Sequence, residues 1–213
     1  MKITSIIFDM DGVLIDAESI HKRATQKAFA DFGITVTDAQ YKPYRGVPDE
    51  VIMVGLSRLF PTAELSVPEL LRVKNYHYEA LEHLAGPIPG AVDFVLWARQ
   101  QYKVALATSG SPRNRKSSLR MLGLQDAFQC IVDRGSVTNF KPHPEVFLKA
   151  AAGLGSAPVE CMVIEDSVNG VTAAKAAGCR VIALTTSFPR ARLLELGPEH
   201  VVDSFAEIPA LLT

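Results

Sequence analysis

The sequence has few cysteines, little net charge and no long hydrophobic run, and each shortage excludes a class of protein. Three of its 213 residues are cysteines, and they form no CxxC pair, so we expect neither a disulfide framework nor a zinc site. The formal net charge of −1 gives no basic field for nucleic acid. No stretch has the length of a membrane span and the first residues do not read as a signal peptide, so we expect a cytoplasmic protein.

The composition is that of a globular protein, with 48% hydrophobic and 21% charged residues. Short hydrophobic runs alternate with helical patterns through most of the chain. Uninterrupted hydrophobic strands between helices are typical of a parallel sheet covered on both faces, so we predict a Rossmann-like α/β core. The runs cover residues 6–8, 104–107, 131–132, 162–164, 181–184 and, more weakly, 201–202.

One segment breaks this alternation. Residues 17–86 contain helical patterns and no convincing strand, and the Gly/Pro-rich stretch 86–90 is typical of a stiff return linker. We therefore predict a small all-helical domain of residues 17–86, inserted after the first strand of a core formed by residues 1–16 and 87–213.

Polar side chains follow the predicted strands, at the edge of the sheet where open parallel sheets bind ligands. Asp9 and Asp11 come directly after the first strand. Residues two apart in an extended segment point the same way, roughly 6.5–7 Å apart, so this pair can flank one small substrate. An ordinary polar turn is the alternative interpretation.

Further charged residues favour a metal and phosphate site. Glu165 and Asp166 follow the fourth strand, and with Asp9 and Asp11 they would gather four carboxylates that need cations. Oxygen ligands suit Mg²⁺, which also binds water and substrate phosphate. Lys141, restrained by the following proline, would add a compensating charge, although single lysines are more often solvated.

A hydroxyl, a glycine and free backbone amides follow the second strand, in Thr108, Ser109 and Gly110. Such a segment ahead of a helix can hold a phosphate group. Ser and Gly also make ordinary loops, so the motif gains its meaning from its place after a strand.

Taken in order, these motifs resemble those of the haloacid dehalogenase-like superfamily, and more closely its β-phosphoglucomutase-like phosphatases. The resemblance implies that Asp9 is the nucleophile and Asp11 the general acid and base. It further implies that phosphate is bound by Thr108, Ser109, Gly110 and Lys141, that Mg²⁺ is bound by Asp9, Asp11, Glu165 and Asp166, and that residues 17–86 are a helical cap domain.

The activity implied is hydrolysis of a small phosphomonoester, a sugar or polyol phosphate, through an aspartyl-phosphate. Alternatives are a β-phosphoglucomutase-type isomerase, a phosphonate hydrolase, or a catalytically silent binding protein on the same fold; the retained acids and lysine argue against the last. Asp49 stands where the mutases carry an arginine, which argues against a mutase. The expected binding partner is a small phosphorylated metabolite, and we expect no binding to nucleic acid or membranes. We expect the protein to be a monomer or a weak dimer. Candidate substrate contacts in the cap, again by resemblance, are His21, Arg45, Gly46 and Lys74.

Overall fold

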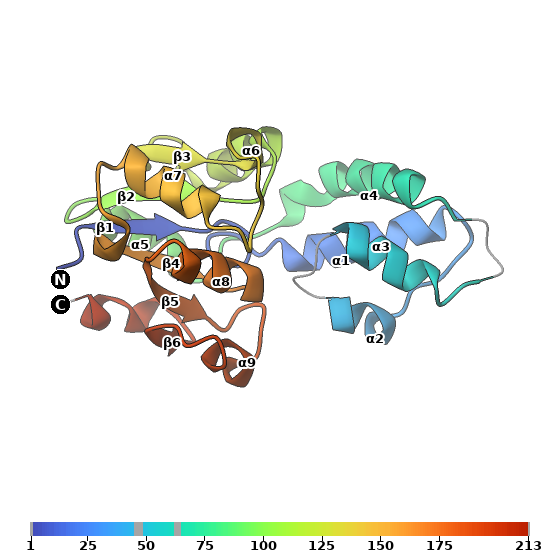
Figure 1. The fold of residues 1–213 in the computed structure, drawn as a ribbon. Coiled ribbons are helices and arrows are strands. Elements are labelled where there is room, and N and C mark those ends of the chain that lie inside the picture. The colour runs from blue at the N-terminus through green and yellow to red at the C-terminus, as the bar shows by residue number, and fades with distance from the viewer. Residues whose placement is uncertain (1, 45–48, 62–64, 213) are drawn as a thin grey trace. The chain divides into compact units, whose positions relative to one another are not determined.

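The computed structural model describes residues 2–44, 49–61 and 65–212. It divides into two compact units: a core unit of Met1–Asp16 and Gly86–Thr213, and a helical unit of Ala17–Ala85 (Figure 1). The sequence placed Gly86 with the insertion, whereas the structure has it in the core unit. A hydrogen bond joins Gly86 to the core unit, since its carbonyl accepts from the Asp16 amide at 2.9 Å.

The core unit contains a six-stranded parallel sheet with the strand order β3-β2-β1-β4-β5-β6. This confirms the predicted Rossmann-like α/β core, including the weakest of the six runs. In register, Ile7 of the central strand β1 lies beside Ala105 of β2 and Val163 of β4. The strands are β1 (Ser5–Phe8), β2 (Lys103–Ala107), β3 (Cys130–Val132), β4 (Cys161–Glu165), β5 (Arg180–Leu184) and β6 (His200–Val202).

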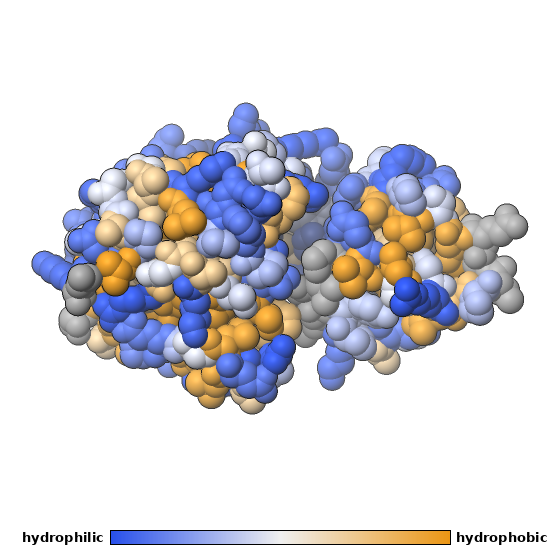
Figure 2. Space-filling model, viewed as in Figure 1, coloured by the Kyte–Doolittle hydropathy of each residue, from blue (hydrophilic) through white to orange (hydrophobic). Residues whose placement is uncertain are grey.

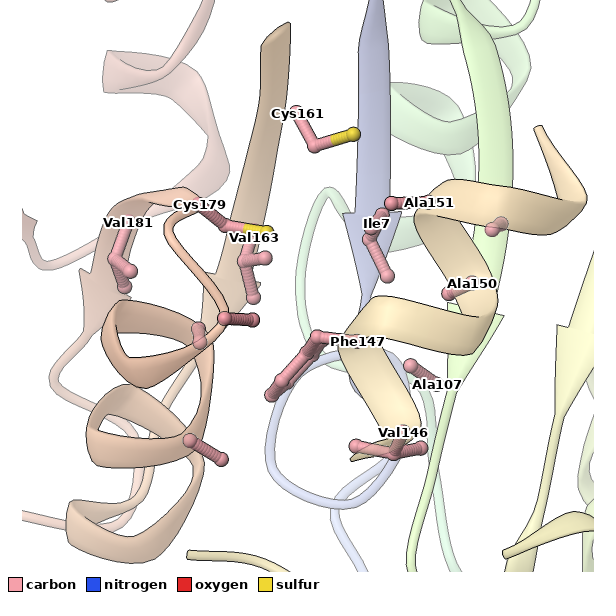
Figure 3. Close-up of a cluster of buried hydrophobic side chains, with 14 of the residues drawn as sticks. Ile7, Ala107, Val146, Phe147, Ala150, Ala151, Cys161, Val163, Cys179 and Val181 are labelled. Atoms are coloured by element: carbon pink, nitrogen blue, oxygen red, sulfur yellow. The ribbon is translucent and has the colours of Figure 1, made fainter. Parts of the chain in front are cut away.

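Helices cover both faces of this sheet. On one face, α7 (Glu145–Gly153) and α8 (Val168–Ala176) pack on buried side chains of β1, β2, β4 and β5, among them Ile7 and Val163 (Figure 3). Phe147 of α7 is fully buried in that layer. On the other face, the ring of Phe8 meets Phe94 of α5 edge-on, with the ring centroids 6.0 Å apart. The remaining core helices are α5 (Ala91–Ala98), α6 (Pro112–Leu122) and α9 (Arg190–Leu194).

The buried layer gives a first testable prediction. Phe147→Ala should lower the free energy of unfolding by about 3–5 kcal/mol, because it removes a large buried side chain and leaves a cavity. Leu148→Ala is the matched control, since Leu148 is the next residue of α7 and its side chain is 43% exposed. Urea unfolding of both variants, followed by circular dichroism, measures the difference. Equal unfolding midpoints would contradict the packing described.

The helical unit has its own small core. Its helices are α1 (Glu18–Ala30), α2 (Asp38–Tyr41), α3 (Asp49–Ser57) and α4 (Val67–Leu81). Phe29, Met53 and Leu70, from three of these helices, are fully buried against one another. The one-turn helix α2 was not predicted, although Thr37 and Gln40 form a capping box at its start.

The surface of the protein is mixed. Figure 2 shows hydrophilic residues over much of the visible face of the core unit, with hydrophobic residues scattered between them. In the part of the chain that the structure describes, no helix has both the length and the hydrophobicity needed to cross a lipid bilayer.

Candidate active site

The register of the sheet brings the predicted acidic residues to one edge. Phe8 of β1 pairs with Ile164 of β4, and the Asp9 amide continues this ladder by donating to the Ile164 carbonyl at 3.0 Å. Asp9 therefore leaves β1 beside the place where Glu165 ends β4. The two residues lie close together because β1 and β4 are adjacent parallel strands that end at the same edge of the sheet.

Three carboxylates and one ammonium form the centre of the site. Asp9, Glu165 and Asp166 are buried, and one carboxylate oxygen of each lies within 4.8 Å of the others. Lys141 Nζ donates to Asp9 Oδ1 at 2.6 Å and to Glu165 Oε1 at 2.8 Å. A third bond, to the Ala107 carbonyl at 3.1 Å, ties this lysine to the end of β2. The Lys141 side chain is only 7% exposed, so these bonds form in a nearly water-free setting.

Burial dominates the charge state of the nucleophile candidate. It raises the pKa of Asp9 to about 8; the Lys141 ammonium opposes this shift, and the charges of Glu165 and Asp11 add to it. For Lys141, burial works against the charged form, but Asp9 and Glu165 outweigh it and raise the pKa of the ammonium. Lys141 is therefore a permanent cation of the site.

The cluster has more acidic than basic groups. Burial, together with the charges of Glu165 and Asp9, raises the pKa of Asp166 well above its ordinary value. One ammonium does not compensate these buried carboxylates, which can all ionise near neutral pH only if a further cation joins them. The donors are oxygens alone, which suits a hard divalent ion such as Mg²⁺. The residues present therefore fit the metal that the sequence suggested.

Glu165 is held more firmly than its neighbours. Its Oε2 accepts from the amides of Asp166 and Ser167, both at 2.8 Å, and from the Ser167 hydroxyl at 3.0 Å. Gly170 of α8 makes room for this carboxylate, because a Cβ there would lie 1.6 Å from Glu165 Oε1. With Lys141 on Oε1, both oxygens of Glu165 already have protein donors.

The loop after β2 lies against Asp11. The Gly110 amide donates to Thr108 Oγ1 at 2.9 Å, which curls the loop over the buried Thr108. A Cβ on Gly110 would lie 3.9 Å from Asp11 Oδ2, so the backbone comes close to that carboxylate. Ser109 is exposed at the tip of the turn. Of the four predicted phosphate-binding residues, Gly110 thus lies beside Asp11 and Lys141 beside Asp9.

Two of the predicted cap residues meet inside the helical unit. Lys74 of α4 is 1% exposed, and its Nζ lies 2.6 Å from Asp49 Oδ2 and 2.8 Å from His21 Nδ1. Burial and the neighbouring Lys74 ammonium lower the pKa of His21 to about 3, although Asp49 opposes the shift. His21 is therefore neutral, and its Nδ1 accepts a hydrogen bond from the Lys74 ammonium. The ring of Tyr78 covers the pair, 5.1 Å from the Lys74 ammonium. Arg45 and Gly46, the other two predicted cap residues, lie outside the described residues.

Two site residues were missed by the sequence analysis. Ser187, in the loop after β5, donates a short hydrogen bond to Asp166 Oδ2, and Thr186 donates to the Gly12 carbonyl at 2.6 Å. The only sequence signal was the polar stretch after a hydrophobic strand, the same signal that identified the other strand ends.

The chain is similar to known proteins over most of its length. The family model described as haloacid dehalogenase-like hydrolase matches residues 6–184. The phosphorylated carbohydrates phosphatase of Thermotoga maritima is 33% identical and aligns over 96% of this chain and 99% of its own length. A crystal structure of β-phosphoglucomutase from Clostridium difficile is 26% identical and superimposes with a TM-score of 0.77, over 98% of this chain and 96% of its own.

A longer relative carries the same region. Protein SUPPRESSOR OF QUENCHING 1 of Arabidopsis thaliana is 32% identical over 97% of this chain. This chain spans only 20% of the length of that plant protein, so the match concerns one part of a larger molecule.

Proposed function

Because this chain belongs to the haloacid dehalogenase-like hydrolases, among the β-phosphoglucomutase-like phosphatases, we propose that it hydrolyses small sugar or polyol phosphates with Asp9 as the nucleophile. The observation that carries the proposal is the contact between Asp9 Oδ1 and Lys141 Nζ at 2.6 Å, inside a buried acidic cluster at the strand ends. A carboxylate kept beside a permanent ammonium is suited to attack a phosphate that the same ammonium attracts.

In the first step, a carboxylate oxygen of Asp9 attacks the phosphorus of the ester. The bond between phosphorus and the ester oxygen breaks, and the leaving oxygen takes a proton from Asp11. Lys141 and the backbone amide of Ser109 stabilise the charge on the equatorial oxygens during this transfer, while the Gly110 amide is held by Thr108 Oγ1. The products of the step are a free alcohol and an aspartyl-phosphate on Asp9.

In the second step, water attacks the phosphorus of the aspartyl-phosphate while Asp11, now ionised, accepts a proton from that water. The bond between phosphorus and the Asp9 oxygen breaks, which restores the carboxylate and releases inorganic phosphate. Asp11 returns to its protonated state, so the residue serves as acid and then as base. General acid and base catalysis of this kind contributes about 10²–10⁴ in rate.

We further propose that Mg²⁺ is held by the carboxylates of Asp9 and Asp166 and by Asp11, with Glu165 at or directly behind these ligands. When bound, the ion supplies charge stabilisation to the phosphoryl oxygens and offsets the repulsion among the carboxylates. The pKa values of Asp9 and Asp166, both raised by burial and by neighbouring acids, support this assignment.

The proposed substrate class draws on the relatives and on the helical unit. The Thermotoga maritima relative is named for phosphorylated carbohydrates, which supports a sugar or polyol phosphate here. We propose that the helical unit acts as the cap, so that its residues help to select the alcohol part of the substrate. His21 and Lys74 are the described residues proposed for this role.

The pairing of Lys74 with Asp49 favours a phosphatase over a mutase. A mutase binds a bisphosphorylated intermediate and needs a cation in the cap for the second phosphate. Here the Lys74 ammonium already faces the Asp49 carboxylate at 2.6 Å. A phosphate brought within 4 Å of that carboxylate would be repelled by about 4 kcal/mol at an effective dielectric of 20.

A substrate panel tests the proposed activity. Release of inorganic phosphate is measured with hexose phosphates, polyol phosphates, nucleotides and a phosphonate, each with Mg²⁺ present. We expect the largest kcat/KM among sugar or polyol phosphates. If every ester in the panel stays intact while a phosphonate is cleaved, the phosphatase proposal is wrong.

A second assay separates hydrolysis from isomerisation. With β-glucose 1-phosphate and a trace of the bisphosphate, we expect phosphate release to exceed the formation of glucose 6-phosphate, which a coupled dehydrogenase reports. Asp49→Asn should shift this ratio toward isomerisation, because it removes the carboxylate that neutralises Lys74. Isomerisation faster than hydrolysis in the unmodified protein would support the mutase instead.

A further inference from the structure

The loop that follows β5 reaches the proposed metal site with two hydroxyl groups. Ser187 donates a short hydrogen bond to Oδ2 of Asp166. Thr186 donates to the Gly12 carbonyl at 2.6 Å, and its hydroxyl oxygen also lies 3.4 Å from the same oxygen of Asp166. Neither residue is charged, and neither belongs to the motifs that carry the family resemblance.

Three segments from distant parts of the chain meet here without space between them. A Cβ on Gly12 would lie 1.8 Å from Asp166 Oδ2 and 2.9 Å from Ser187 Oγ. Gly12 has a φ of +78°, which a residue with a side chain rarely adopts. The Gly12 backbone, the Asp166 carboxylate and the β5 loop therefore fix one another's positions.

From these contacts we propose that Ser187 and Thr186 are positioning residues for the divalent cation, an inference that rests on the proposed function. Ser187 occupies one oxygen of Asp166 and thereby leaves the other oxygen for the ion. Thr186 holds the Gly12 carbonyl and so fixes the backbone directly after Asp11, the second residue proposed to bind the ion. The two hydroxyls set the orientation of ligands from two different strands.

Positioning residues are needed because the carboxylate of an aspartate can rotate. The terminal torsion of Asp is broad, so an unsupported carboxylate samples many orientations. A hydrogen bond to one oxygen selects the orientation that the metal requires. Metal binding is then stronger, because the ion does not have to order the carboxylate itself. Loss of a hydrogen-bonding partner behind a metal ligand typically weakens metal binding about 10–100-fold.

The test measures metal binding directly. Metal-free Ser187→Ala is titrated with Mn²⁺, whose free form is counted by electron paramagnetic resonance, and with Mg²⁺ by calorimetry. We expect about 10–100-fold weaker binding than in the unmodified protein. Ser187→Thr, which keeps the hydroxyl, should restore most of the affinity. At saturating Mg²⁺, kcat of Ser187→Ala should approach that of the unmodified protein, a separation that general loss of structure would not give.

A neighbouring hydroxyl provides the matched control. Thr185 lies in the same loop, but its hydroxyl donates to Asp203 Oδ1 at 2.6 Å. Thr185→Val should therefore bind Mn²⁺ as the unmodified protein does. Equal affinity of Ser187→Ala and the unmodified protein overturns the positioning role. No Mn²⁺ binding by the unmodified protein would instead contradict the metal site of the proposed function, so the two failures are distinguishable.

Discussion

Asp9→Asn is expected to lower phosphate release by more than about a thousandfold, because an amide is a poor nucleophile and no aspartyl-phosphate can form. The fold should be retained, since Lys141 keeps its bond to Glu165 Oε1 at 2.8 Å. Substitution of a buried carboxylate by an uncharged amide also relieves repulsion from the neighbouring acids. Steady-state kinetics with the preferred ester of the panel measures the loss.

Two further variants make this experiment specific. Asp126→Asn applies the same chemical change to an exposed residue of the core unit and should leave turnover unchanged. Asp11→Asn should lose about 10²–10⁴ in rate, the contribution of general acid and base catalysis. With p-nitrophenyl phosphate, whose leaving group needs little protonation, Asp11→Asn should give a burst of product followed by slow turnover. Turnover of Asp9→Asn within tenfold of the unmodified protein rules out Asp9 as the nucleophile.

Removal of divalent ions should also lower phosphate release strongly. After dialysis against a chelator, phosphate release should fall at least about a hundredfold, because metal charge stabilisation is worth several kcal/mol and each 1.36 kcal/mol is tenfold in rate. The structural reason is the charge of the site: the Lys141 ammonium pairs with the buried carboxylates of Asp9 and Glu165, and Asp166 adds a third buried carboxylate to the cluster.

The identity of the ion is tested by comparing how well different divalent ions restore activity. Added Mg²⁺ should restore activity, whereas Ca²⁺ should bind and restore little, because Ca²⁺ prefers longer bonds and more ligands than a compact carboxylate site offers. Thermal unfolding offers an independent readout, since an ion that binds only the folded protein raises its melting temperature. Full activity with no measurable metal would overturn the role of the acidic cluster.

The fold could be predicted from local patterns because most of its determinants are local. Hydrophobic runs marked all six strands, including the three-residue β6, and in the structure a serine caps the start of α6 (Ser111) and of α8 (Ser167). Both serines accept a hydrogen bond from the amide three residues ahead, at 3.2 Å and 3.0 Å. Such caps are written in a few adjacent residues. Thr37 and Gln40 carried the same kind of signal for α2, but a helix of one turn is too short to show a hydrophobic periodicity.

The site was predictable only where strand order brings residues together. Asp9 follows β1 and Glu165 ends the adjacent parallel strand β4, so topology alone sends them to one edge. Lys141 reaches them from the segment between β3 and α7. The bond from Thr186 to Gly12 joins residues 174 positions apart, and no local pattern reports it. Lys74 is a similar case. From the sequence it was a candidate substrate contact, and only the structure shows that it is buried in a charged pair with Asp49.

The hydrogen bond between the Asp16 amide and the Gly86 carbonyl has a consequence for the entropy of folding. It joins the two ends of a roughly 70-residue insertion, so the core loses little continuity where the insertion leaves and returns. Closing a disordered loop of that length would cost about 4 kcal/mol, but a segment that folds by itself brings its own ends near each other and lowers this cost. By holding residues 16 and 86 together, the bond limits the loop-closure entropy that the insertion adds to the folding of the core.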